Sequence, residues 1–184
     1  MTNLANASSL IYTALLAFPA HFGDGNRSVN WCGTFCCSNT TKSFSQLFAT
    51  GFYLDSPLFP SPTISKANQT IHDQVLILGP FCGKPACQLI NYSPKRARGV
   101  CADAYNKRQT LVVPDVEAYP GHIACDGETK SEIVVPLILR LPGSETKHAL
   151  GVLDLDCLAL NGFNEEDKFG LERIAQLIID ACDW

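Results

Sequence analysis

The amino-acid sequence predicts an α+β fold, in which helices cover one largely antiparallel sheet. Short apolar runs bounded by Gly, Pro or polar turn residues recur from Gln74 onwards, which is typical of strands. Helical periodicity is confined to the start, the middle and the end of the chain. With 184 residues, 46% of them hydrophobic, the chain is long enough to bury a substantial core. We therefore expect a single domain over residues 1–184.

The first third of the chain is predicted to hold a helix, a strand and a long insertion. Residues 4–17 place their larger apolar side chains loosely on one helical face, and Pro19 ends the helix. Residues 30–37 are predicted as a strand. The range 38–70 contains eleven Ser or Thr and three Pro, so we interpret it as an insertion between two strands.

The rest of the chain has a more regular pattern. Apolar runs predict strands at 75–78, 86–92, 110–113, 132–141 and 149–156. A short helix is predicted over 100–107, because Gly99 precedes it and Lys107 suits its last turn. The last helix is expected to begin at Asn164, where Asn-Glu-Glu-Asp has the pattern of a capping box.

Charge and hydropathy exclude several classes of function. The net charge of −4 argues against a nucleic-acid-binding protein, which normally carries a clustered basic face. No run approaches the roughly 20 apolar residues that span a bilayer, so we expect no membrane insertion. No Lys or Arg precedes Arg27, so the basic start of a signal peptide is missing and we expect a cytoplasmic protein.

The cysteine content bears on the cellular compartment. Nine cysteines in 184 residues form an odd set in a chain longer than a typical secreted disulfide framework. A secreted, disulfide-stabilised protein is nevertheless an alternative, because Asn26, Asn39, Asn68 and Asn91 begin glycosylation-type triplets. The spacing of Cys32, Cys36 and Cys82 is not that of a zinc knuckle, so no metal site is predicted.

Three cysteines are candidates for redox chemistry: Cys87, Cys101 and Cys125. Each lies beside a turn or a helix start, where thiolate stability controls reactivity. Cys101 falls in the first turn of the helix predicted over 100–107, so the helix dipole is expected to lower the pKa of its thiol. On local grounds alone, ordinary buried or loop cysteines are an equally good interpretation.

Three acids are candidates for substrate binding and proton transfer: Glu132, Asp154 and Asp156. The two aspartates are two residues apart on a predicted strand, so they project from the same face of the sheet while Leu153 and Leu155 face the other way. Two carboxylates so close together raise one pKa, which yields a proton donor near neutral pH. Solvent-exposed acids at the end of a strand are the alternative.

Five segments, taken in order, carry a resemblance to a known family. They are Gly79-Pro-Phe-Cys-Gly-Lys-Pro-Ala-Cys87, Gly99-Val-Cys101, Pro120-Gly-His-Ile-Ala-Cys125-Asp, Ser131-Glu-Ile-Val-Val-Pro-Leu137 and Gly151-Val-Leu-Asp-Leu-Asp156. Over roughly residues 79–180 the sequence closely resembles the free methionine-(R)-sulfoxide reductases, which are single-domain enzymes of the GAF fold. Asn30-Trp31 adds a weaker match.

The resemblance implies reduction of free L-methionine (R)-S-oxide by thiol chemistry, without a bound cofactor. It implies that Cys125 attacks the sulfoxide and that Cys87 and Cys101 are resolving or recycling partners, whereas the helix dipole favours Cys101 as the attacking thiol. The implied substrate-binding residues are Glu132, Asp154, Asp156 and Trp31. Thioredoxin is the implied external reductant, and a homodimer is the implied assembly.

The sequence also departs from the family pattern. Cys82 replaces a Gln, and the family segment Asn-Trp-x-Gly-Phe-Tyr is followed only to Cys32-Gly33, which predicts the loss of a tyrosine hydroxyl. The same fold also occurs in binding modules, so a non-catalytic GAF-type module that senses a small ligand or an oxidant is the second functional hypothesis.

Overall fold

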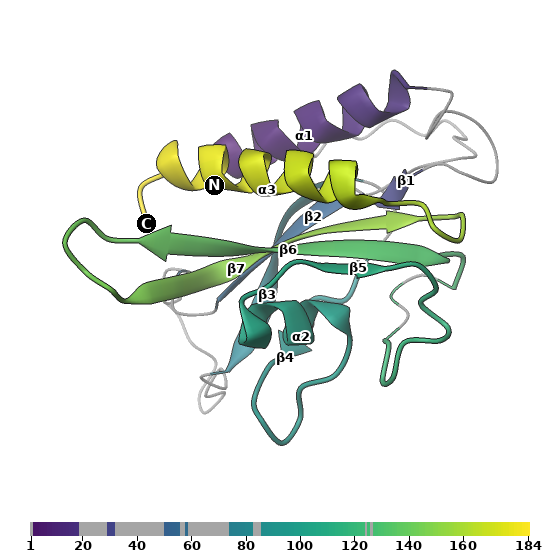
Figure 1. Ribbon diagram of the computed structural model, residues 1–184, viewed down its shortest axis with the longest axis horizontal. Helices are drawn as coiled ribbons and strands as arrows, with labels where there is room; N and C mark the ends of the chain where they lie inside the picture. The colour runs from purple at the N-terminus through teal and green to yellow at the C-terminus, as the bar shows by residue number, and fades with distance from the viewer. Residues whose placement is uncertain are drawn as a thin grey trace, which may run out of the picture.

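The computed structural model describes residues 2–18, 29–31, 50–55, 58, 74–82, 86–123, 125 and 127–184. Within them, a curved antiparallel sheet lies between two layers of helix (Figure 1). Helices α1 (Thr2–Leu16) and α3 (Glu165–Asp180) cover one face, and α2 (Val100–Lys107) covers the other. This architecture confirms the predicted α+β class. In the part of the chain that the structure describes, no helix combines the length and apolarity needed to cross a membrane.

Seven strands of the described residues form the sheet. They are β1 (Val29–Trp31), β2 (Thr50–Asp55), β3 (Val75–Cys82), β4 (Leu89–Asn91), β5 (Leu111–Val113), β6 (Ser131–Arg140) and β7 (Lys147–Cys157). Their order is β4-β3-β2-β7-β6-β5, and β1 pairs with β7. Strands β2 and β7 therefore lie at the centre, and the long strand β6 lies beside β7. The paired ends of β6 and β7 carry the residues of greatest chemical interest.

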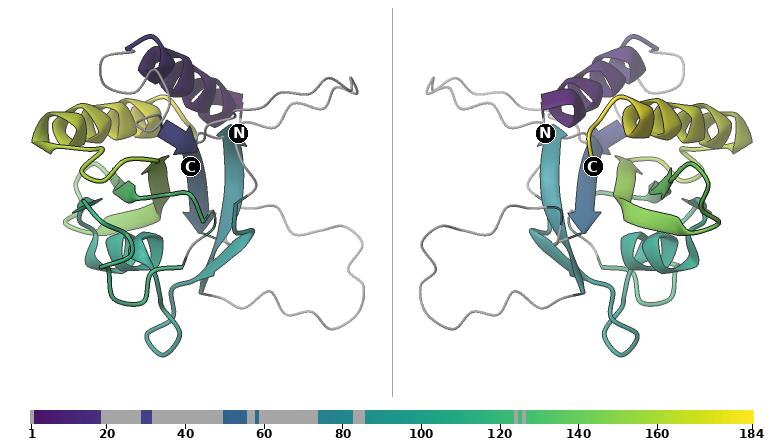
Figure 2. Two further views of the ribbon diagram at one scale, coloured as in Figure 1. Left: turned by 90° about the vertical axis from the view of Figure 1, so that its right-hand side faces the viewer. Right: turned by 90° about the vertical axis from the view of Figure 1, so that its left-hand side faces the viewer.

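β1 and β2 pair with consecutive stretches of β7 (Figure 2). The backbone register sets Trp31 opposite Asp156 and Thr50 opposite Leu155, so β2 continues along β7 where β1 ends. The insertion predicted over 38–70 is therefore wrong for 50–55, which belong to the centre of the sheet. The apolar triplet Phe52-Tyr-Leu54 was masked by Ser-, Thr- and Pro-rich sequence on both sides. Apart from Leu58, the other residues of that range, and residues 32–37 of the predicted first strand, lie outside the described part.

The sheet divides the core into two layers by simple alternation along its strands. Phe52 and Leu155 face α1 and α3, in a cluster with Leu4 and Ile178. Tyr53, Val134 and Val152 face α2, together with Val100 and Ala104. The predicted alternation on β7 is confirmed. Leu153 and Leu155 are fully buried on the side of α1 and α3, while Asp154 and Asp156 lie on the α2 side.

Close packing of β2 on β7 requires a glycine at Gly151. A Cβ atom there would collide with the carbonyl oxygen of Tyr53 and would lie 2.7 Å from the Cα atom of Leu54. The absence of a side chain thus lets β2 approach β7 and fixes Tyr53 at the centre of the sheet.

Helices α2 and α3 begin where the start signals at Gly99 and Asn164 predict. α2 spans Val100–Lys107 as expected, with Gly99 before it at φ 83° and Arg108 after it in the left-handed region. α3 begins after Asn164, whose side chain accepts hydrogen bonds from the backbone of Glu166 and Asp167. Asp167 completes the capping box by accepting from the backbone N–H of Asn164 at 2.9 Å.

Candidate active site

A cavity opens on the α2 face of the sheet, where the ends of β6 and β7 meet the start of α2. It encloses about 520 Å³ of space, part of which is open to solvent. Its floor comes from the central strands and its rim from the segments before β4 and before β6. The lining residues include all three candidate cysteines and all three candidate acids: Cys87, Cys101, Cys125, Glu132, Asp154 and Asp156. The sequence prediction that these residues share one site is therefore consistent with the geometry.

The register of β6 on β7 brings the acids together. Glu132 lies directly opposite Asp156, and Asp154 is two residues further along β7 on the same face. All three are buried, with 5% to 8% of their surface exposed. Burial, and then the charge of Asp156, raise the pKa of Glu132 well above its usual value. Burial, and then Glu132, do the same to the pKa of Asp154. This cluster thus holds protons at a pH where exposed carboxyl groups have lost them.

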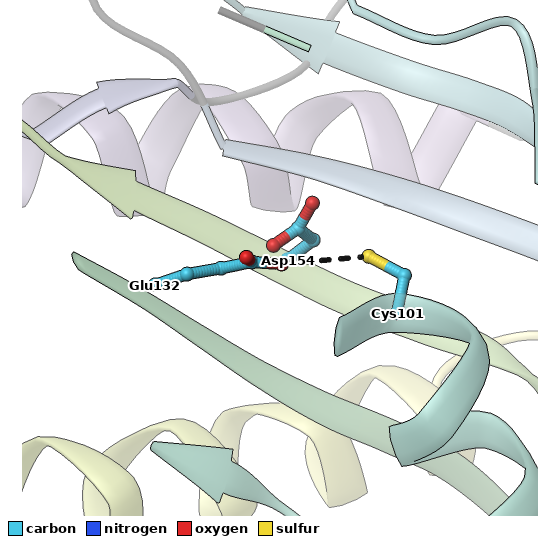
Figure 3. Close-up of side chains that lie close together, drawn as sticks. All are labelled: Cys101, Glu132 and Asp154. Atoms are coloured by element: carbon cyan, nitrogen blue, oxygen red, sulfur yellow. Dashed lines mark hydrogen bonds between the residues drawn. The ribbon is translucent and has the colours of Figure 1, made fainter. Parts of the chain in front are cut away.

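Cys101 faces these acids from the first turn of α2 (Figure 3). Its Sγ atom donates toward Glu132 Oε1 at 3.8 Å, and Asp154 lies beside both groups. Burial, followed by the carboxylates of Asp154 and Glu132, raises the pKa of the Cys101 thiol well above its ordinary value. The lowered pKa predicted from the helix dipole is wrong, because desolvation and neighbouring negative charge outweigh the dipole.

Cys87 and Cys125 form a disulfide at the rim of the cavity. Their Cα atoms are 5.5 Å apart, although 38 residues separate them in the sequence. Cys101 and Cys182 are free thiols. The structure therefore pairs two of the three candidate redox cysteines and leaves the third against the acids.

Two aromatic side chains of the site were missed or undervalued in the sequence. Tyr53 lines the cavity and is almost completely buried, so the predicted loss of a tyrosine from this site is wrong. The triplet Gly51-Phe-Tyr53 was the signal that could have revealed it, displaced along the chain from Asn30-Trp31. His122 also lines the cavity, with its Nε2 atom 3.6 Å from Glu132 Oε2. Burial lowers the pKa of His122, while burial and Asp156 raise the pKa of Glu132, so both shifts favour the uncharged forms of this pair.

Trp31, the remaining predicted binding residue, belongs to β1. The backbone register places it opposite Asp156, at the end of β7 that carries the acids. Its strand therefore borders this end of β7, and the role of Trp31 in substrate binding stays a prediction.

The site also contains a set of atoms that could hold a cation. One ligand atom each from Cys101, Glu132 and Asp154 lie within 4.8 Å of one another. No metal site was predicted from the sequence, where only Cys32, Cys36 and Cys82 were considered. The three donors come from α2, β6 and β7, so their proximity depends on the tertiary fold.

Comparisons with known proteins place this arrangement in context. The chain is 41% identical to free methionine-R-sulfoxide reductase of Saccharomyces cerevisiae over 180 residues, which cover 98% of this chain and 74% of the yeast protein. The chain belongs to the free methionine-R-sulfoxide reductase family. No family model matches the sequence. This membership agrees with the five motifs identified in the sequence.

Solved structures of the family share the fold. A GAF-domain structure is 40% identical, with a TM-score of 0.67 over 98% of this chain and 76% of the other. Free methionine-R-sulfoxide reductase of Neisseria meningitidis, solved in complex with its substrate, is 29% identical with a TM-score of 0.58. That alignment covers 95% of this chain and 76% of the Neisseria chain. The predicted GAF-like fold is thereby confirmed.

Proposed function

We propose that this protein reduces free methionine-R-sulfoxide to methionine, with Cys125 as the nucleophile and Cys87 as the resolving thiol. The observation that carries the proposal is the meeting of a cysteine pair close enough for a disulfide with a buried, proton-holding acid cluster in one cavity. Sulfoxide reduction needs both parts: a thiol that takes the oxygen and an acid that protonates it.

The acids select a free amino acid. A substrate ammonium group in this cavity would find Asp154 and Asp156 as partners, and Asp154 Oδ1 is a buried atom that accepts no hydrogen bond from the described residues. A charged donor bonded to such an oxygen gives a strong, short interaction. At the rim, the guanidinium group of Arg98 is available to the substrate carboxylate. Peptide-bound methionine sulfoxide lacks both charges and would leave these groups unpaired.

Glu132 is the proposed proton donor. Burial and Asp156 raise its pKa well above the ordinary value, so it keeps its proton to a higher pH than an exposed carboxyl group. It can then deliver that proton to the sulfoxide oxygen as the thiolate of Cys125 attacks the sulfur. In the balanced step, the S–O bond of the substrate breaks, methionine leaves with a two-electron-reduced sulfur, and Cys125 becomes a sulfenic acid. The Cys87 thiol then attacks the sulfenic sulfur, which forms the Cys87–Cys125 disulfide and releases water.

An external dithiol must return the disulfide to two thiols, and we infer that thioredoxin fills this role. The disulfide lies at the rim, where Leu89 and Ile123 are 60% and 48% exposed and offer an apolar surface next to it. The odd number of cysteines supports a reducing, cytoplasmic compartment for the cycle. A homodimer stays part of the proposal, and sedimentation of the full chain tests it.

The deciding experiment measures methionine formation from the separated R and S sulfoxides, free and within a peptide, with thioredoxin or dithiothreitol as reductant. We expect turnover of the free R epimer alone. Comparable rates on both epimers, or on free and peptide-bound sulfoxide, would contradict the proposed binding mode. Binding of the free sulfoxide with no methionine formed would instead identify a sensing module.

Single-turnover assays on three variants separate the thiols. Cys125→Ser should release no methionine, because serine is a far weaker nucleophile at neutral pH. Cys87→Ser should release one equivalent and then stop, since the sulfenic acid lacks its partner. Cys101→Ser should still form the Cys87–Cys125 disulfide, because Cys101 is not part of it. A burst of methionine from Cys125→Ser with none from Cys101→Ser would transfer the attack to Cys101.

A further inference from the structure

The thiol of Cys101 lies among the acids and takes no part in the disulfide, so the proposed reduction cycle gives it no chemical step. It contacts Glu132 at 3.8 Å and is 6% exposed. A buried thiol against buried carboxyl groups is an unfavourable neighbour once any of them ionises, because like charges repel in a low-dielectric site. A group that neutralises them together would stabilise this arrangement.

We propose that Cys101, Glu132 and Asp154 form a binding site for a borderline-soft divalent cation, which Zn²⁺ fits best, and that this ion excludes the sulfoxide substrate. The three ligand atoms already lie within 4.8 Å of one another. Tetrahedral Zn²⁺ with a thiolate at about 2.3 Å and a carboxylate oxygen at about 2.1 Å separates sulfur from oxygen by about 3.6 Å. The observed separation of Cys101 Sγ and Glu132 Oε1 is 3.8 Å.

A second observation points to a missing cationic partner. Asp154 is 6% exposed and lines the cavity, yet its Oδ1 atom has no hydrogen-bond partner among the described residues. Buried carboxylate oxygens are normally hydrogen-bonded, paired with a cation or bound to a metal. The ammonium group of the substrate meets this need in the proposed function. The neighbouring thiol adds a donor that an ammonium group does not use and that Zn²⁺ prefers.

The donor set selects among metals. One sulfur and two carboxylate oxygens suit Zn²⁺, whereas Mg²⁺ prefers six oxygen ligands and keeps much of its water. The imidazole of His122 lies 3.6 Å from Glu132 and adds a nitrogen donor at the edge of the site. Zn²⁺ binding releases protons to solvent. The Cys101 thiol loses its proton when its sulfur bonds to Zn²⁺, and a protonated carboxyl group loses its proton when it becomes a ligand.

The first test measures binding to the oxidised full chain, so that Cys87 and Cys125 cannot contribute thiolates. Zn²⁺ is titrated in competition with a chromophoric chelator, and Co²⁺ is used as an optical probe. We expect one ion per chain, a thiolate-to-cobalt charge-transfer band, and the release of at least one proton per ion in calorimetry with two buffers. Mg²⁺ should not compete. The absence of a stoichiometric ion, or of the charge-transfer band, overturns the proposal.

Variants locate the ion. Cys101→Ser and the isosteric Asp154→Asn should each weaken Zn²⁺ binding by at least about 100-fold, since loss of an outer-shell group alone costs roughly 10–100-fold. Cys182→Ser is the matched control and should bind Zn²⁺ as the parent does, because Cys182 packs against the core on the α1 and α3 side of the sheet. Loss of binding in this control, with retention in Cys101→Ser, would place the ion elsewhere. Thermal unfolding and circular dichroism of each variant confirm that a weaker affinity is not a loss of fold.

The competition with substrate rests on the proposed function and has its own readout. Methionine-R-sulfoxide added to the Zn²⁺-loaded oxidised protein should release the ion to the chelator without turnover. In the reduced enzyme, Zn²⁺ should raise the apparent KM and leave kcat unchanged. If the protein binds Zn²⁺ at Cys101 but never reduces the sulfoxide, the proposed function fails and the metal site stands. Simultaneous binding of both ligands would refute the exclusion.

Discussion

The most direct test of the chemistry is Glu132→Gln, which keeps the shape of the side chain and removes its acidic proton. Glu132 is 5% exposed, so solvent water has little access to replace it as a proton donor. A positioned general acid typically contributes about 10²–10⁴-fold to rate. At 1.36 kcal/mol for each factor of ten, this corresponds to about 2.7–5.4 kcal/mol of transition-state stabilisation. We expect the Glu132→Gln substitution to lower kcat/KM for free methionine-R-sulfoxide by about 10²–10⁴-fold.

The pH dependence of the single-turnover rate tests the same assignment of Glu132 as the acid. The protonated form of Glu132 is the active one, and burial together with Asp156 raises its pKa above the ordinary value. The single-turnover rate of the parent should therefore be constant below this raised pKa and fall as the pH rises through it. The residual rate of Glu132→Gln should show no such fall, because glutamine does not titrate. His122 does not reproduce this limb, since burial lowers its pKa.

The assay is stopped-flow or quenched release of methionine from one equivalent of sulfoxide by the reduced enzyme, from pH 5 to pH 9. Glu166→Gln is the matched control, because Glu166 is exposed in the first turn of α3, across the sheet from the cavity. It should retain the parent rate. A rate for Glu132→Gln within a few-fold of the parent, or an unchanged alkaline limb, would refute the assignment of Glu132 as the acid.

Four further predictions concern stability and substrate orientation. In urea titrations, Asp154→Asn should raise the free energy of unfolding by about 1 kcal/mol or more at pH 8 and by less at pH 5. The reason is that the pKa of Asp154 is higher in the folded state than in the unfolded state. The parent therefore loses stability as the pH rises from the unfolded-state pKa to the folded-state pKa. Gly151→Ala should lower the stability of the fold by at least about 1–3 kcal/mol, because the added methyl group overpacks against β2. Gly170→Ala in α3, where a Cβ atom meets nothing within 4 Å, should raise the stability by about 0.5–1 kcal/mol. Equal effects of the two variants in thermal unfolding would count against the packing argument. Asn164→Ala should cost about 1 kcal/mol by removing the cap of α3, measured by the same method. Arg98→Gln should raise KM with little change in kcat, and an unchanged KM would remove Arg98 from the binding site.

Local rules predicted much of this fold. The bounds of α2 were predicted from Gly99, which precedes the helix, and from Lys107 in its last turn. In the structure the backbones of Gly99 and Arg108 have φ 83° and 54°, so neither residue continues the helix. The position of Asp154 and Asp156 on one face follows from the period of two along a strand. The start of α3 follows from the hydrogen-bonding capacity of Asn164. In each case, the information lies within a few residues.

Long-range features could not be derived in this way. Residues 50–55 lie between stretches rich in Ser, Thr and Pro, and only the pairing with β3 and β7 shows them to be a central strand. The shift in the pKa of Cys101 was predicted with the wrong sign. Its chain neighbours supply a helix dipole, whereas the tertiary fold buries the thiol and places the carboxylates of Asp154 and Glu132 beside it. The disulfide between Cys87 and Cys125 joins two segments whose distance no local rule determines.

The site combines acids on sheet strands with thiols on segments outside the strands, and the proposed chemistry requires both. The acids lie on the long strands β6 and β7, so their mutual positions are held by a ladder that keeps one register from Ser131 to Leu137. The thiols of Cys87 and Cys125 lie outside the strands, in segments that lead into the sheet. In the proposed cycle, Cys125 must first reach the substrate sulfur and must then meet Cys87, while the substrate stays in one orientation during the first step. An acid cluster fixed by the sheet and a nucleophile carried by a loop meet both requirements, because only the loop has to move between the two steps.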